Sequence, residues 1–201
     1  MNLLNEPQKP CFLVFEGIDG SGKSLLSRMV HGELGRLGYD SVWTCEPSDK
    51  ARAKIREANS EWDVLFAFLQ DRAEHKERIQ AWMAEGKVVV CDRYIPSTYA
   101  YQGPRLEKMI PNAYDWLMRI NGPISVPVNR YYFLDVDTKI AMERLDKRKE
   151  KESFETLTQM TQAGEQYRKM ATNQGWVTVN AEQTVTQVFE QIMADVRGLV
   201  L

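Results

Sequence analysis

The sequence contains little cysteine and no long hydrophobic run. Its 201 residues include only three cysteines, and their spacing matches neither a zinc site nor a redox pair. We therefore expect Cys11, Cys45 and Cys91 to be buried free thiols. No stretch contains the roughly 18 uninterrupted apolar residues that a membrane-spanning helix needs, so we expect no association with membranes.

Neither sign of charge is in clear excess. Charged residues make up 27% of the chain and the net charge is -2, which argues against a general basic field for nucleic acid polymers or anionic membranes. Any anion site must therefore be local. The first ten residues lack the basic region and apolar core of a signal peptide, so we expect a cytoplasmic location. With 43% hydrophobic residues, the chain can bury one sizeable core, which predicts a single domain over residues 1–201.

Short β-branched or aromatic runs alternate with longer stretches of helical periodicity. This alternation is typical of an α/β fold in which helices cover both faces of a parallel sheet. We expect strands at 11–16, 41–46, 87–92, 130–136 and 176–180. We expect helices near 22–37, 61–85, 107–120, 138–172 with a break, and 184–197, and a loop at 122–128.

The segment EGIDGSGKS, residues 16–24, contains the phosphate-loop motif G-x-x-x-x-G-K-[ST] between an apolar strand and a helical stretch. Its backbone N–H groups can surround a polyphosphate, Lys23 can reach the outer phosphates and Ser24 can ligate Mg²⁺. GTPases, ATPases and small-molecule kinases share this loop, so it does not define the reaction. Two carboxylates, Glu16 and Asp19, are unexpected in a loop that binds anions.

A second candidate site lies where the strand 87–92 ends in Asp92 and Arg93. Open α/β sheets bind their ligands at the carboxyl ends of their strands. Asp92 could hold Mg²⁺ through water, and Arg93 could bind a phosphate with two hydrogen bonds. The alternative is an ion pair between the two residues that only caps the strand.

The helix 61–85 combines an apolar stripe with an aromatic and basic pair beside it. Phe68 and Arg72 are four residues apart on one flank, which suits stacking on a flat base and hydrogen bonding to its edge. Alternatively, Phe68 packs under another helix and Arg72 is solvated. The stripe expected to face the core comprises Trp62, Leu65, Phe66, Leu69 and Ala73.

These segments together resemble the thymidylate kinase family of P-loop nucleoside monophosphate kinases. The resemblance implies a three-layer P-loop kinase fold with a five-stranded parallel sheet, and transfer of the γ-phosphoryl group of ATP to dTMP with Mg²⁺. It also implies a homodimer. The likeness covers most of the chain and rests on Asp19 in the loop, Glu46-Pro47, F-x-x-x-R at Phe68 and Arg72, D-R-Y-x-x-S-x-x-A-Y-Q from Asp92 to Gln102, the FLDVD strand end and Asn180-Ala181.

The resemblance also implies roles for individual residues. Asp19 would bond the 3′-hydroxyl of the acceptor, Phe68 would stack on thymine, and Arg72 would read the base edge. Arg93 would hold the acceptor phosphate, and Tyr101 would fill the space that a 2′-hydroxyl needs. The role of Glu16 stays open between orienting the loop amides or Lys23 and a purely structural part.

Three sets of binding residues follow from the same resemblance. The acceptor site would comprise Asp19, Pro47, Phe68, Arg72, Arg93, Ser97, Thr98, Tyr101 and Gln102. The ATP site would comprise Gly17, Ile18, Asp19, Gly20, Ser21, Gly22, Lys23, Ser24, Leu25, Asn180 and Ala181. Ser24 and Asp92 would bind the metal.

Catalysis of phosphoryl transfer needs cations where charge develops. We expect Lys23 and Arg93 to supply two of these cations. Family members place a further arginine either in the phosphate loop or on a lid, and this loop has none, so a short lid around 143–155 should supply Arg144 or Arg148. The alternative for this charged segment is an ordinary solvated helix.

One position departs from many relatives, which carry arginine before Glu-Pro where this chain has Cys45. A supporting contact is missing, or Lys50 or Arg52 replaces it. Two other functions stay open: a kinase for another nucleotide, and a P-loop switch or assembly ATPase. The DxxG and NKxD strings of GTPases are absent.

Overall fold

The computed structural model describes residues 8–147 and 156–200. Its centre is a parallel sheet of five strands in the order β2-β3-β1-β4-β5, which confirms the expected α/β fold. In this register Phe15 pairs with Asp92 and Cys45 also pairs with Asp92, so β1, β2 and β3 end side by side. The strands are β1 (Cys11–Glu16), β2 (Ser41–Cys45), β3 (Val88–Asp92), β4 (Arg130–Asp135) and β5 (Val177–Asn180).

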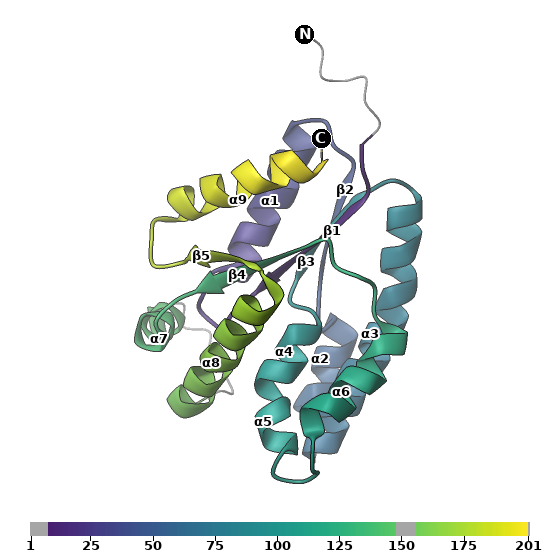
Figure 1. The fold of residues 1–201 in the computed structure, drawn as a ribbon, viewed down its shortest axis with the longest axis vertical. Helices are drawn as coiled ribbons and strands as arrows, with labels where there is room; N and C mark the ends of the chain where they lie inside the picture. Colours follow the sequence, from purple (N-terminus) through teal and green to yellow (C-terminus); the bar gives the residue numbers. More distant parts are fainter. Residues whose placement is uncertain (1–7, 148–155, 201) are drawn as a thin grey trace.

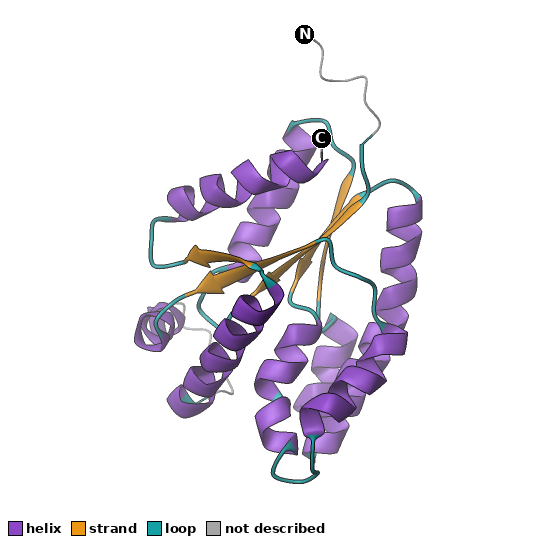
Figure 2. Cartoon of the chain, in the orientation of Figure 1, coloured by secondary structure: helices purple, strands orange, loops and turns teal. Residues whose placement is uncertain are grey.

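Helices cover both faces of the sheet (Figure 1), and Figure 2 shows the strands enclosed between them. One face carries α1 (Lys23–Arg36) and α9 (Val185–Val200), and the other carries α3 (Glu61–Ala84) and α8 (Leu157–Gln174). The other helices are α2 (Asp49–Arg56), α4 (Ile95–Tyr101), α5 (Gly103–Leu106), α6 (Ala113–Asn121), the 3-10 turn η2 (Gly122–Ile124) and α7 (Thr138–Lys147).

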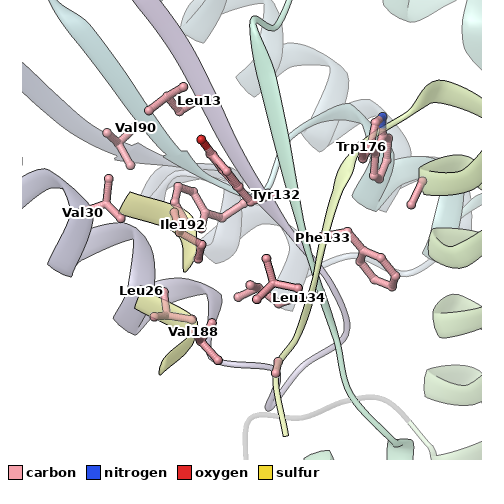
Figure 3. Close-up of a cluster of buried hydrophobic side chains, with 14 of the residues drawn as sticks. Leu13, Leu26, Val30, Val90, Tyr132, Phe133, Leu134, Trp176, Val188 and Ile192 are labelled. Atoms are coloured by element: carbon pink, nitrogen blue, oxygen red, sulfur yellow. The ribbon is translucent and has the colours of Figure 1, made fainter. Parts of the chain in front are cut away.

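The largest hydrophobic cluster joins the sheet to α1 and α9. Figure 3 shows Leu26 and Val30 of α1 beside Val188 and Ile192 of α9, with Leu13 of β1 among the sheet residues that they cover. All of these side chains are buried, and β1 is buried along its whole length. Burial of this apolar surface is the main driving force that holds the strand ends in place.

Three helices are not predicted by the periodicity, and one predicted helix is partly wrong. The short α2 buries only Ala51, so it has no apolar stripe to detect. The helices α4 and α5 each have a proline in the first turn. Because both helices are short and proline is also common in turns, the sequence around them indicates a loop. The helix expected at 107–120 begins only at Ala113, because residues 107–112 form turns around Pro111.

The stripe predicted for α3 is wrong at one position. Leu65 is buried against α6, but Phe66 is 56% exposed and stacks on the ring of Trp62. Among the described residues, no helix is long and apolar enough to span a bilayer. The cysteines are free thiols as expected, with Cys11 and Cys91 buried and Cys45 half-buried.

Candidate active site

The phosphate loop runs from the end of β1 to the start of α1, and its glycines are required by its geometry. Gly20 and Gly22 have φ angles of 80° and 99°, which side chains rarely adopt. A Cβ atom at Gly20 would lie 2.3 Å from the carbonyl oxygen of Ala141 in α7. The loop therefore cannot carry an arginine at this position, because the backbone of α7 occupies the space.

Lys23 is the first residue of α1 and is only 5% exposed. Its Nζ donates to the carbonyl oxygen of Ile18 at 2.7 Å, inside the loop. Burial and the neighbouring charge of Arg93 lower the pKa of Lys23 to about 8. Phosphate oxygens bound in the loop would favour the charged amine and raise that pKa again.

Ser24 and Asp92 meet at the start of α1. Ser24 Oγ donates a hydrogen bond to Asp92 Oδ2. Asp92 is 6% exposed, and its Oδ1 has no hydrogen-bond partner within residues 8–147 and 156–200. A buried carboxylate oxygen without a partner is unfavourable unless a water or a cation satisfies it. The pair therefore has the oxygen ligands and the open acceptor that Mg²⁺ binding through water requires.

Arg93 follows β3 with a φ of 68°, an unusual conformation for a residue with a side chain. Its Nη1 donates to the carbonyl oxygen of Gly17 at 3.3 Å and to Ser97 Oγ at 3.0 Å, and it also reaches the hydroxyl of Tyr167. Its Nη2 forms an ion pair with Asp19 Oδ1. The backbone conformation thus turns the guanidinium into the phosphate loop.

Asp19 is the loop carboxylate that lines a cavity beside the phosphate loop. Burial alone would raise the pKa of Asp19, but the charges of Arg93 and Lys23 outweigh it and lower the pKa to about 2. The carboxylate is therefore ionised at neutral pH and available as a hydrogen-bond acceptor. This electrostatic setting explains how an acidic side chain is tolerated beside a phosphate site.

Glu16, the other loop carboxylate, is fully buried at the end of β1. Its Oε1 accepts from the backbone N–H of Tyr94 at 2.7 Å. Its Oε2 accepts from Ser97 Oγ and from the hydroxyl of Tyr167, each at 2.9 Å. Within the described residues it has no hydrogen bond with Lys23, so its partners favour a part in bracing the segment around Arg93. Burial raises the pKa of Glu16 to about 7.

Tyr167 is a site residue that the sequence analysis does not identify. It lies on α8, 151 positions from Glu16 in the chain, and its hydroxyl is 2.8 Å from Ser97 Oγ. A tyrosine within a helical stretch reads as a core residue, and its ring does pack on Phe133. Only the hydroxyl belongs to the polar site, and no local pattern reveals it.

A cavity opens at the carboxyl end of the sheet, beside the phosphate loop. It brings together most of the residues predicted for the acceptor, with Asp19 and Arg93 at the loop and Phe68 on the wall formed by α3. The predicted residues that line it are Asp19, Pro47, Phe68, Arg93, Ser97, Tyr101 and Gln102.

The helix α2 supplies three further lining residues, Arg52, Ile55 and Arg56. A helix start signal is present in the sequence, because Ser48 caps α2 by accepting from the backbone N–H of Ala51 at 3.3 Å. That signal could have revealed the helix. It could not have revealed that one face of the helix turns toward the cavity.

Arg72 and Thr98 do not line this cavity. Arg72 is 1% exposed, and its Nε and Nη2 donate to Glu46 Oε2 at 3.0 and 2.7 Å. Nη2 also donates to Thr98 Oγ1 at 3.1 Å, and Nη1 donates to Asn121. Arg72 is therefore not solvated, and its role in reading the base stays a prediction.

The predicted ATP-site residues Asn180 and Ala181 lie at the end of β5 and in the turn after it, next to the predicted catalytic residue Arg144 of α7. Arg144 Nη2 donates to the carbonyl oxygen of Ala181 at 2.9 Å, and Asn180 accepts from the backbone N–H of Glu182. Since Ala141 contacts the loop at Gly20, α7 connects the phosphate loop with the turn after β5. Leu25 is 43% exposed on α1. Arg148 and the rest of 148–155 lie outside the described residues.

A parallel sheet with a phosphate loop at its carboxyl edge defines the class of P-loop nucleotide-binding proteins, and the cavity described above shares Asp19 with that loop. The family model described as "Thymidylate kinase" matches residues 15–192. The chain therefore belongs to the thymidylate kinase family of ATP-dependent nucleoside monophosphate kinases. Its substrates are accordingly small molecules.

Individual relatives agree with this assignment. The chain is 36% identical over 174 residues to the thymidylate kinase of Leptospira interrogans serovar copenhageni, covering 81% of this chain and 82% of the relative. It is 33% identical over 140 residues to the probable thymidylate kinase of Thermoplasma acidophilum, covering 68% and 71%. It is 28% identical over 193 residues to the probable thymidylate kinase of Methanosarcina mazei, covering 92% and 94%.

Proposed function

We propose that this protein transfers the γ-phosphoryl group of ATP to dTMP and so produces dTDP. The observation that carries the proposal is the Asp19 and Arg93 ion pair, which belongs at once to the phosphate loop and to the neighbouring cavity. Family membership and the names of the relatives support the same reaction. A donor in the loop and an acceptor in the cavity would meet at this pair.

The residues of the two sites divide the work of the reaction. The loop amides and Lys23 bind the donor phosphates, while Arg93 binds the acceptor phosphate that attacks. Phe68 stacks on the base, and Asp19 accepts a hydrogen bond from the 3′-hydroxyl. Two anions must approach in line, so catalysis rests on their positioning and on cations at the developing charge. A general base is not required.

Ser24 and Asp92 are the residues that would hold Mg²⁺ in this reaction. The unsatisfied Oδ1 of Asp92 and the adjacent Ser24 hydroxyl support this assignment. When bound by these residues, the ion would supply positive charge to the transferring phosphoryl group. The protein contributes the orientation of its oxygen ligands.

A coupled assay of ADP release across nucleoside monophosphates tests the proposed function. We expect the highest specificity constant with dTMP, and loss of activity in Lys23→Met, which ties the turnover to this loop. A higher specificity constant for dUMP, UMP or a nucleoside would assign another nucleotide kinase. ATP turnover that no monophosphate stimulates would instead indicate a switch or assembly ATPase.

We also propose that the whole chain acts as one domain and works as a cytoplasmic homodimer. Family membership supports the dimer, and the exposed ring of Phe66 beside Trp62 provides apolar surface that a second subunit could cover. Sedimentation of the pure protein at micromolar concentration measures the state. A monomer under these conditions would contradict the proposed homodimer.

A further inference from the structure

Glu16 is a buried charged group for which the proposed reaction has no use. Its two oxygens accept three hydrogen bonds, one from the backbone N–H of Tyr94 and two from the hydroxyls of Ser97 and Tyr167. Removing a carboxylate from water is unfavourable unless hydrogen bonds and a nearby cation compensate for the lost hydration. The charge of Arg93 opposes the effect of burial on the pKa of Glu16, although in the described part of the chain the two side chains form no direct ion pair. Glu16 therefore acts on Arg93 through the two hydroxyls that lie between them.

The two hydroxyls lie close to the same carboxylate oxygen and to each other. Ser97 Oγ and the hydroxyl oxygen of Tyr167 are each 2.9 Å from Glu16 Oε2, and they are 2.8 Å apart. Each hydroxyl has one proton to donate, whereas an ionised carboxylate can only accept and makes the stronger hydrogen bond. Both protons therefore point at Oε2. The lone pairs of the two hydroxyl oxygens are left facing away from the carboxylate.

The guanidinium of Arg93 lies against those lone pairs. Its Nη1 donates to Ser97 Oγ at 3.0 Å and to the hydroxyl of Tyr167 at 3.3 Å, besides the carbonyl oxygen of Gly17. Two hydroxyl oxygens that do not donate to each other repel at this separation, and a cation that donates to both offsets the repulsion. Nη2 is paired with Asp19, while Nε forms no hydrogen bond within residues 8–147 and 156–200. Nε and the second hydrogen of Nη2 are therefore available to a ligand.

We propose that Glu16 is a positioning residue, which orients Arg93 through the hydroxyls of Ser97 and Tyr167 so that one edge of the guanidinium is offered to the acceptor phosphate. This inference rests on the proposed function, because it takes Arg93 as the ligand of that phosphate. Tyr167 belongs to α8 and does not line the cavity, so α8 contributes to the acceptor site from outside it. Without the carboxylate, the hydroxyl protons would be free to turn toward the guanidinium and repel it.

Tyr167→Phe removes one hydroxyl and keeps the ring that packs on Phe133. The measurement is calorimetry at pH 8, above the pKa of about 7 of Glu16, so that the carboxylate is ionised. The dissociation constant of dTMP should rise roughly five- to tenfold, since a hydrogen bond between the hydroxyl and a charged group is lost on each side. The dissociation constant of thymidine, which has no phosphate for Arg93 to bind, should change less than about twofold.

Tyr132→Phe is the matched control. Tyr132 is also a buried tyrosine whose hydroxyl donates to a carboxylate, Asp195 Oδ2 at 2.8 Å, but it does not line the cavity or contact Arg93. This variant should lower the thermal stability about as much as Tyr167→Phe does, and it should leave dTMP affinity unchanged. The comparison separates the loss of a buried hydrogen bond from an effect on the acceptor site.

Glu16→Gln tests the carboxylate itself. An amide in its place donates toward the hydroxyls, so their protons turn toward Arg93, and dTMP affinity should fall more than in Tyr167→Phe. The double variant should lose less than the product of the two single losses, because both changes act on the same hydroxyl. Thymidine affinity should again change little. If Glu16→Gln does not fold, Tyr167→Phe and its control decide the question.

Three results would overturn the inference. Equal losses for dTMP and thymidine in Tyr167→Phe would make the hydroxyl a structural group, and unchanged dTMP affinity would separate it from Arg93. Independent losses in the double variant would show that Glu16 does not act through Tyr167. The proposed function fails separately, if the unsubstituted protein prefers another monophosphate. That monophosphate and its nucleoside would then replace dTMP and thymidine in the same comparison.

Discussion

The guanidinium of Arg93 lies 2.5 Å from the carboxylate of Asp19, and this ion pair joins the end of β3 to the phosphate loop. In the proposed reaction, this contact links the donor and acceptor sites through two side chains. Arg93 also contacts Ser97 and Tyr167, which are bound in turn by the buried Glu16. A change at Asp19 should therefore act on the acceptor rather than only on ATP.

Asp19→Ala should lower kcat/KM for dTMP by roughly tenfold or more, since it removes an acceptor for the 3′-hydroxyl and a partner of Arg93. The loss should be smaller with 3′-deoxy-dTMP, which cannot make that hydrogen bond. Steady-state kinetics of both proteins with both substrates gives the coupling energy. Equal losses for the two substrates would exclude Asp19 as the partner of the 3′-hydroxyl.

ATP affinity should depend on pH through Lys23. The pKa of this amine is lowered from 10.5 to about 8 in the free protein, and bound phosphates raise it. Affinity should be constant below pH 8 and fall as the pH rises through 8, because binding then requires proton uptake. Calorimetry from pH 7 to pH 9.5 measures the affinity for ATP, and the comparison of two buffers with different ionisation enthalpies gives the number of protons taken up on binding. The two quantities should agree through the linkage relation. Lys23→Arg should bind without this dependence; a slope that persists in the variant would contradict the assignment.

Phe68→Ala should raise the KM for dTMP while leaving the KM for ATP nearly unchanged, because the lost stacking, roughly 1 to 3 kcal/mol, concerns only the acceptor. Phe66→Ala is the matched control, since Phe66 lies on the same helix but does not line the cavity. Steady-state kinetics with dTMP and ATP varied in turn gives the KM for each substrate in each variant. An unchanged KM for dTMP in Phe68→Ala would return this ring to a packing role.

Tyr101 should control the choice between deoxyribose and ribose. Its ring lines the cavity, and the guanidinium carbon of Arg93 lies 5.4 Å from its centroid. Tyr101→Phe keeps the ring and should keep discrimination against the ribonucleotide, whereas Tyr101→Ala should weaken it. Specificity constants for the deoxyribonucleotide and ribonucleotide test this, and equal selectivity in all three proteins would remove Tyr101 from the role.

The two lid arginines should act at different stages. Arg144 already donates to the carbonyl oxygen of Ala181, so Arg144→Ala should chiefly raise the KM for ATP. Because α7 leaves no room for a side chain at Gly20, the transferring group needs a cation from elsewhere, and Arg148→Ala should depress kcat more than either KM. An arginine finger contributes roughly 10³ to 10⁵ in rate, which sets the upper scale. Near-normal kcat in both single variants and the double variant would refute a lid arginine.

Much of the site is predictable from the sequence because it is built from residues close together in the chain. The phosphate loop, Asp92 with Arg93, and Phe68 on α3 each belong to one strand end or one helix face. A strand followed by a glycine-rich turn and a helix forms its anion site from its own backbone. Parallel strands with their carboxyl ends at one edge then bring these segments together.

Other features were decided by packing between distant segments. Arg72 is buried rather than solvated because Glu46, at the end of β2, neutralises it 26 positions away. Phe66 is exposed although Trp62 and Leu69, its neighbours on the same side of α3, pack against the cluster that includes α6. Tyr167 joins the site because α8 lies against α4.

The sequence by itself therefore determined the class of protein and its phosphate loop, which depend on local backbone geometry and on strand order, and it predicted seven of the residues that line the cavity. Only the tertiary structure decided which charged side chains face the cavity. Arg52, Lys50 and Arg72 have similar chemistry in the sequence. Their different surroundings follow from the rotation of α2 and α3 against the sheet, which places one guanidinium at the cavity, one amine at the surface and one guanidinium in the interior.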